Sequence, residues 1–96
     1  MTGGHVYILT NKPRGVLYIG VTADLARRLH EHDRGLGSKF AKRYNCDKLV
    51  LAEVYPTIEE AIAREKAMKA WKREWKVELI ERSNPDWQDL SGEAFL

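Results

Sequence analysis

The sequence has little of what marks several common classes of protein. It contains one cysteine, Cys46, which excludes an internal disulfide and a zinc site built from several cysteines. No hydrophobic run approaches the ~18 residues of a membrane-spanning helix. The first residues carry neither the cationic nor the apolar segment of a secretory signal. We therefore expect a cytoplasmic protein with Cys46 as a reduced thiol and with no membrane partner.

Several catalytic motifs are also missing. We find no serine or cysteine nucleophile with a partnered base. There is no glycine-rich phosphate loop of the nucleotide-binding type, and the three histidines lack the spacing of a zinc site. These absences argue against the covalent hydrolases, the P-loop nucleotidases and the zinc enzymes.

What is present is typical of one small globular domain. The chain has 96 residues, of which 44% are hydrophobic and 31% charged. We expect a single domain over residues 1–96, with a core over about 4–90 and an acidic C-terminal tail.

Charge is unevenly spread along the chain. Residues 1–48 hold nine Lys or Arg and four Asp or Glu, for a net charge of +5, whereas residues 49–96 hold seven and ten, for −3. A positive first half suggests a polyanionic partner such as nucleic acid. A solvated surface with uneven charge is the alternative.

Short segments rich in aromatic and β-branched residues predict three strands. Residues 5–10 and 16–21 flank a turn with Asn, Pro and Gly, so they form an antiparallel hairpin. If Thr10 pairs with Gly15, Tyr7 lies opposite Tyr18 on one face of the sheet. Residues 48–55 form the third strand.

Capping signals place two helices between the second and third strands. Thr22 is the expected N-cap of a helix that runs to about Asp33, and Gly35 lies just past its end. Ser38 is the expected cap of a short helix over residues 39–44.

A capping box marks the start of the last helical region. Thr57 and Glu60 have the required spacing. No Gly or Pro interrupts residues 57–83, so the pattern fits one long helix or two adjoining ones equally well. Trp71 and Trp75 continue an apolar stripe, and we expect both to pack in the core.

Two polar side chains share the inward stripe of the first helix. Leu25 and Leu29 define this stripe, and Arg28 and His32 extend it at helical spacing. A helix that only packs would carry apolar residues at these positions. The pair therefore indicates either a functional site or an ordinary polar pair at the edge of the helix.

Other charged residues also allow two interpretations. Glu65 falls inside an apolar stripe, where a carboxylate is costly unless it forms a salt bridge or binds a metal. Lys39, Lys42 and Arg43 form a basic stripe beside aromatic residues, which predicts either a nucleic-acid contact or a solvated face.

Taken together, these residues resemble the GIY-YIG nuclease domain, and most closely its small stand-alone bacterial members. The resemblance covers roughly residues 4–90. The second half of the name motif is intact as Tyr18-Ile19-Gly20, while His5-Val6-Tyr7 matches the first half only at its tyrosine. The remaining matches, in order and at the family's positions, are Arg28, His32, Glu65 and Asn84.

The resemblance implies an α+β fold in which helices flank a three-stranded antiparallel sheet, with two helices over residues 57–83. It implies hydrolysis of DNA phosphodiester bonds with one divalent ion, Mg²⁺ or Mn²⁺. Glu65 would bind the metal, and Arg28 would contact the phosphate.

The resemblance also assigns the remaining residues. Tyr7 or Tyr18 would act as general base, with Tyr7 preferred, and His32 would accept or orient the phenol proton. Asn84 would help to position the site without contacting the reacting groups. Gly20 would serve a structural turn.

A non-catalytic nucleic-acid-binding or adaptor module on the same scaffold is the alternative. The partner is expected to be DNA of unspecified structure, with RNA as a second possibility, and a separate protein could supply targeting. A role in DNA repair follows only by analogy with larger family members.

Overall fold

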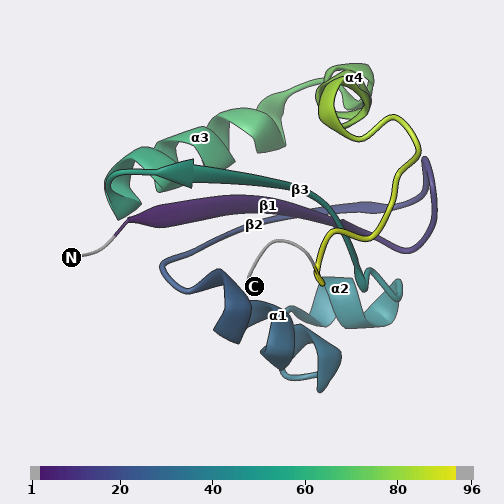
Figure 1. Cartoon of the computed structure of the whole chain (residues 1–96), viewed down its shortest axis with the longest axis horizontal. Coiled ribbons are helices and arrows are strands. Elements are labelled where there is room, and N and C mark those ends of the chain that lie inside the picture. Colours follow the sequence, from purple (N-terminus) through teal and green to yellow (C-terminus); the bar gives the residue numbers. More distant parts are fainter. Residues whose placement is uncertain (1–2, 93–96) are drawn as a thin grey trace.

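The computed structural model describes residues 3–92. Within these residues, two strands are followed by two helices, one further strand and two further helices (Figure 1). They are β1 (Gly4–Thr10), β2 (Leu17–Thr22), α1 (Leu25–Asp33), α2 (Lys39–Arg43), β3 (Lys48–Tyr55), α3 (Ile58–Ala70) and α4 (Arg73–Ser83). The expected α+β architecture is confirmed, including the two separate helices over residues 57–83. None of the helices in the described part of the chain is long and apolar enough to cross a membrane.

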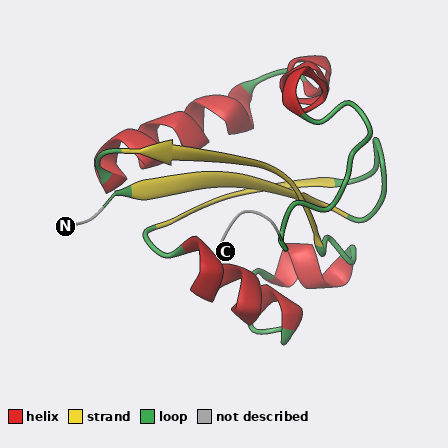
Figure 2. Ribbon diagram, viewed as in Figure 1, coloured by secondary structure: helices red, strands yellow, loops and turns green. Residues whose placement is uncertain are grey.

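The strands form one antiparallel sheet in the order β2-β1-β3. The helices lie in two layers, with α3 and α4 on one face of the sheet and α1 and α2 on the other (Figures 1 and 2). Because side chains alternate along a strand, β1 contributes to a core on each face. Val6 and Ile8 pack with Met68 of α3, whereas Tyr7 and Leu9 pack with residues of α1 and α2.

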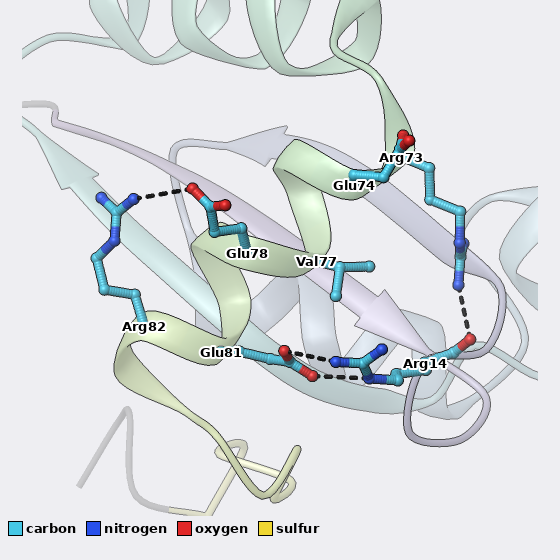
Figure 3. Close-up of a pocket in the computed structure, with 7 residues that line it drawn as sticks. All are labelled: Arg14, Arg73, Glu74, Val77, Glu78, Glu81 and Arg82. Carbon is cyan, nitrogen blue, oxygen red and sulfur yellow. Dashed lines mark hydrogen bonds and ion pairs between the residues drawn. The ribbon is translucent and has the colours of Figure 1, made fainter.

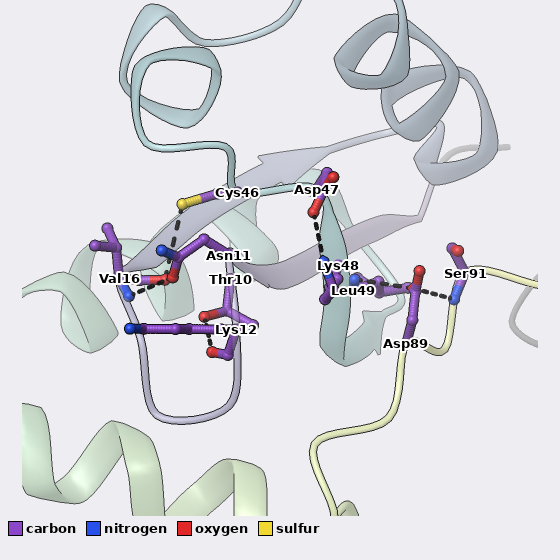
Figure 4. A network of polar contacts seen from close by, with 10 residues as sticks. All are labelled: Thr10, Asn11, Lys12, Val16, Cys46, Asp47, Lys48, Leu49, Asp89 and Ser91. Atoms are coloured by element: carbon purple, nitrogen blue, oxygen red, sulfur yellow. Dashed lines mark hydrogen bonds and ion pairs between the residues drawn. The ribbon is translucent and has the colours of Figure 1, made fainter.

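The hairpin register differs from our prediction by two residues. Thr10 pairs with Leu17 instead of Gly15, and Tyr7 lies opposite Gly20 instead of Tyr18. The turn is longer because the Asn11 carboxamide oxygen accepts a hydrogen bond from the backbone N–H of Val16 at 2.9 Å (Figure 4). A shift of two keeps each side chain on its face, so the two tyrosines remain diagonal neighbours.

The cap of α1 is Asp24, so the prediction of Thr22 was wrong. The Asp24 carboxylate accepts a hydrogen bond from the backbone N–H of Arg27. The Thr22 hydroxyl instead accepts from the backbone N–H of Asp24, and Thr22 remains the last residue of β2. Gly35 follows the helix with φ of +73°, as its C-terminal position predicts.

The break between α3 and α4 turns Trp75 outward. Trp71 and Lys72 have extended backbone, with ψ of 153° and 148°. Trp71 packs partly buried against the core, but the Trp75 residue is 53% exposed. The prediction of a core role for Trp75 was wrong because the apolar stripe does not continue in phase through two non-helical residues.

The C-terminal segment closes the structure along β3. A β-bulge lies between Ile8 and Leu9 of β1, and Val50 of β3 has no partner across it. The Val50 carbonyl instead accepts a hydrogen bond from the Asn84 side chain at 3.2 Å. Further along, Asp89 accepts from the backbone N–H of Leu49 (Figure 4). The part of the acidic tail beyond residue 92 lies outside the described residues.

Candidate active site

Three ring side chains meet on the face of the sheet covered by α1 and α2. Tyr7 comes from β1, Tyr18 from β2 and His32 from the last turn of α1. The hydroxyl of Tyr7 lies 3.1 Å from Nε2 of His32. The Tyr18 ring contacts both others, with its centroid 6.2 Å from that of Tyr7 and 5.5 Å from that of His32. The sheet and the helix together therefore position one compact cluster.

Two glycines leave room for this cluster. A Cβ on Gly20 would lie 2.4 Å from both Cζ and the hydroxyl oxygen of Tyr7, and a Cβ on Gly37 would lie 2.4 Å from Nδ1 of His32. Gly20 lies inside β2, so its assignment to a structural turn was wrong. Its importance comes from the cross-strand pairing with Tyr7, since the buried phenol fills the space that a side chain would need.

The phenol of Tyr7 is held in its neutral form. Burial raises its pKa above the ordinary value of 10, and the neighbouring Tyr18 adds to the increase. The charge of Arg28 lowers the pKa and that of Glu65 raises it, so both side chains lie within electrostatic range of Tyr7. A tyrosine that acts as a base needs a nearby cation to lower its pKa. Arg28 acts in that direction on Tyr7, but burial outweighs it.

His32 is also held neutral. Burial is the main cause that lowers its pKa, and the charge of Arg28 lowers it further, while Glu31 opposes them. A neutral imidazole with its proton on Nδ1 accepts a hydrogen bond at Nε2. In that tautomer the Tyr7 hydroxyl donates to His32.

Arg28 lies at the rim of the cluster. Its side chain is 40% exposed, and its Nε lies 3.5 Å from a carboxylate oxygen of Glu31. Both residues line a depression of about 450 Å³ that also reaches Ile58 at the start of α3. The long, exposed contact with Glu31 is weak, so the guanidinium is available to an incoming anion. Sequence reasoning missed Glu31, although its spacing of three from Arg28 was a usable signal.

Glu65 extends from α3 and is the most enclosed of the charged candidates. Its side chain is 13% exposed, and one carboxylate oxygen lies 2.7 Å from Nζ of Lys69, one helical turn later. The salt bridge that we considered for Glu65 is therefore present. Lys69 was not singled out beforehand, although a spacing of four on a helix is the expected geometry for such a pair.

The donor set fits a divalent ion that keeps most of its water. Among residues 3–92, no three His, Cys, Asp or Glu side chains come together in an arrangement that holds a metal ion. Mg²⁺ is commonly bound by one or two carboxylates together with water and substrate phosphates, without a complete protein cage. The Glu65 carboxylate fits that requirement, because it is 13% exposed and its charge acts on Tyr7.

A row of aromatic rings leads from the cluster to the surface. The Tyr18 ring stacks on Phe40 of α2, with the centroids 6.3 Å apart, and Phe40 contacts Tyr44 at 4.8 Å. Phe40 of α2 and Tyr44, which follows this helix, are exposed. The three predicted basic residues of α2 are exposed as well: Lys39, Lys42 and Arg43. The basic stripe thus lies beside the cluster, on the same face of the sheet.

Asn84 lies away from the cluster, at the C-terminal end of α4. It is 5% exposed, and its amide nitrogen donates to the backbone oxygens of Val50 and Gln88. Its side-chain oxygen accepts from the backbone N–H of Gln88. Asn84 therefore joins α4 and the C-terminal segment to β3, and any effect on the cluster would pass through this packing.

A separate depression of about 860 Å³ lies between the β1–β2 turn and α4 (Figure 3). Arg14 and Glu81 form a two-point ion pair across it. Arg73 donates to the backbone oxygens of Arg14 and Gly15. These hydrogen bonds and the ion pair hold the β1–β2 turn against α4, and they engage the charged groups that line the depression.

The chain is similar to known proteins over most of its length. A family model described as the GIY-YIG catalytic domain matches residues 3–78. A UPF0213 protein of Staphylococcus saprophyticus is 36% identical over 76 residues, covering 79% of this chain and 92% of the relative. A UPF0213 protein of Staphylococcus aureus is also 36% identical, with 93% of the relative covered.

One solved structure shares the fold. The solution NMR structure of a UPF0213 protein from Bacillus halodurans superposes with a TM-score of 0.58 at 28% sequence identity. The match covers 98% of this chain and 99% of the other. The three-stranded sheet and its helices are thus shared with a protein of the same size.

Proposed function

Because this chain belongs to the GIY-YIG family, we propose that it is an endonuclease that hydrolyses phosphodiester bonds in DNA with the help of a divalent metal ion. The single observation that carries the proposal is the contact between the Tyr7 hydroxyl and His32 Nε2, 3.1 Å long, within reach of the charges of Arg28 and Glu65. A partnered proton donor and acceptor beside an available guanidinium is suited to phosphodiester hydrolysis.

Tyr7 would activate the attacking water as part of a relay. A neutral phenol is a poor base, so Tyr7 would take the proton of the water while its own proton passes to His32. The raised pKa of Tyr7 and the lowered pKa of His32 favour this starting arrangement, in which the phenol is protonated and the imidazole is not. Tyr18 is the second choice for the base, because it contacts the His32 ring by its edge.

Arg28 would stabilise the charge that grows on the phosphate. Its weak contact with Glu31 leaves the guanidinium able to turn toward two non-bridging oxygens. Glu65 would hold the divalent ion, and the ion supplies Lewis-acid stabilisation of the phosphate and the leaving oxygen when bound. Lys39, Lys42 and Arg43 would bind phosphates of the flanking nucleic acid.

A cleavage assay tests this proposal. Wild-type protein, Glu65→Gln and the matched control Glu59→Gln would be incubated with duplex, single-stranded, flap and four-way-junction DNA in Mg²⁺, Mn²⁺ or EDTA. Glu59 is an exposed carboxylate in the first turn of the same helix. We expect metal-dependent cleavage that Glu65→Gln abolishes and Glu59→Gln retains. Full activity of Glu65→Gln would remove Glu65 from the site.

The ion pair between Lys69 and Glu65 favours a second candidate function. A carboxylate already bound by an ammonium group at 2.7 Å fits a nucleic-acid-binding module that keeps the scaffold without turnover. Both functions predict salt-dependent DNA binding, but only the enzyme gives a metal-dependent product. Replacing Lys39, Lys42 and Arg43 together by alanine should weaken DNA binding in either case. Unchanged binding would exclude a role for this stripe.

A further inference from the structure

The corner between α3 and α4 carries a second concentration of positive charge. Residues 49–96 are acidic overall, yet six of their seven basic residues fall between positions 64 and 76. Only Glu65 and Glu74 oppose them there, so this short segment has a net charge of +4. We define the α3–α4 corner by the exposed or half-exposed residues Lys66, Lys69, Lys72, Trp75 and Lys76.

A large exposed aromatic side chain lies beside one of these cations. The Trp75 residue is 53% exposed, and Nζ of Lys72 lies 6.0 Å from the centre of its ring. The inner face of the corner is fixed, because Trp71 packs on the core and meets Trp75 edge to face at 6.4 Å. An exposed indole held in place beside a cation offers a flat apolar surface for contact.

The corner adjoins the candidate active site. Lys69 of the corner is the partner of Glu65, and Nζ of Lys76 donates a hydrogen bond to the backbone oxygen of Lys69 at 3.4 Å. The corner is therefore continuous with the helix that carries Glu65. Within residues 3–92, neither Lys66 nor Lys72 forms an ion pair.

The positive charge of the corner and its position next to Glu65 favour a polyanion as its partner. We infer that the α3–α4 corner is a second contact surface for the nucleic acid whose scissile phosphate lies at the Tyr7–His32 cluster, a proposal that rests on the proposed function. Lys66 and Lys72 bind phosphates of this strand, and Trp75 packs against the sugar or base of one nucleotide.

The two basic surfaces lie on opposite layers of the molecule. The basic stripe of α2 belongs to the layer of α1 and α2, and the corner belongs to the layer of α3 and α4 (Figure 1). A strand that contacts both is held on either side of the bond to be cleaved. This arrangement would position the phosphate by contacts on both of its sides.

Binding experiments in EDTA test the corner without turnover. The probe is a fluorescein-labelled 30-base-pair duplex, or its single strand, followed by anisotropy over a range of salt concentrations. The variants are Lys66→Gln/Lys72→Gln and Trp75→Ala, with Trp75→Tyr as the conservative change. Lys12→Gln/Arg82→Gln is the control, because it removes the same charge at two other exposed positions.

The expected result is specific to the corner. Removing the two lysines should lower the slope of log affinity against log salt by roughly 1 to 2, since each phosphate contact contributes about 0.7 to 0.9. Trp75→Ala should weaken binding about fivefold or more, and Trp75→Tyr should retain most of the affinity. In cleavage assays these variants should raise KM with kcat unchanged, because the contact is the same in substrate and transition state.

Two negative results are distinguishable. If wild-type protein binds and cleaves while the corner variants match the control, the corner is not a nucleic-acid surface, and a protein partner becomes the better explanation of Trp75. If wild-type protein neither binds nor cleaves any probe, the proposed function falls together with this inference. Circular dichroism of each variant establishes that it is folded.

Discussion

Replacing Gly20 by alanine should damage both stability and activity through one contact. The added methyl group would lie 2.4 Å from the Tyr7 ring carbon Cζ and 2.4 Å from its hydroxyl oxygen. Tyr7 is 1% exposed and lies in a packed core, so its ring has little room to withdraw. Overpacking of this kind costs about 1–3 kcal/mol. Alanine also reduces the entropy of the unfolded chain, which returns roughly 0.4–1 kcal/mol.

The net destabilisation should therefore be about 0–2.6 kcal/mol, or a fall in Tm of up to roughly 20 °C for a domain of this size. Any withdrawal of the Tyr7 ring also lengthens its 3.1 Å contact with His32. Cleavage should decrease about 100-fold, because a misplacement of 1 Å is enough for a loss of that size.

Differential scanning calorimetry and the cleavage assay measure the two effects. Gly92→Ala is the matched control, since a Cβ there would meet no atom of the described residues within 4 Å. The double variant Gly20→Ala/Tyr7→Phe removes one of the two closest contacts and should be less destabilised than the sum of its parts. A Gly20→Ala protein as stable and as active as Gly92→Ala would refute the packing argument.

Further outcomes follow from charge and hydrogen bonding. Arg28→Gln should lower kcat by roughly 10²–10³. The same change should raise the pKa of His32, measured by NMR titration, because the charge of Arg28 lowers that pKa. An unchanged pKa would show that the two side chains do not interact. Since His32 must be neutral to accept a proton, activity should hold down to pH of about 6.5 and fall only below it. The same lowered pKa stabilises the fold above that pH, and this contribution is lost as the pH falls toward the folded pKa. Asn84→Ala should destabilise the protein by about 1–3 kcal/mol in urea unfolding, since the Val50 carbonyl loses its donor, whereas a change at exposed Ser83 should not.

Part of the candidate site's geometry is predictable because its residues lie on regular elements. Arg28 and His32 are four apart on one helix, so helical periodicity places them on the same side of α1. The position of Glu65 relative to them depends on how α3 packs on the sheet, which periodicity does not encode. The register of the hairpin depends on a side-chain bond within the turn, from Asn11 to Val16, and periodicity carries no information about it. The hydrophobic pattern therefore could not predict that Tyr7 pairs with Gly20.

Tertiary contacts account for the other differences. The role of Gly37 depends on the approach of the His32 ring across a loop, which local sequence does not encode. Trp75 follows the stripe of Trp71 in sequence, but two extended residues change the phase of the helix between them. Hydrophobic type alone thus predicts burial only while the element that carries it is continuous.

The C-terminal segment also has a consequence for association between molecules. Trp87 packs into one core and Leu90 against the other, and the backbone N–H of Leu90 bonds to the oxygen of Leu49. β3 is an edge strand, and open edges invite pairing between chains. This edge stays uncovered until residue 90 has folded back onto β3, so the C-terminal segment protects the completed fold, and not the nascent chain, from pairing with other molecules.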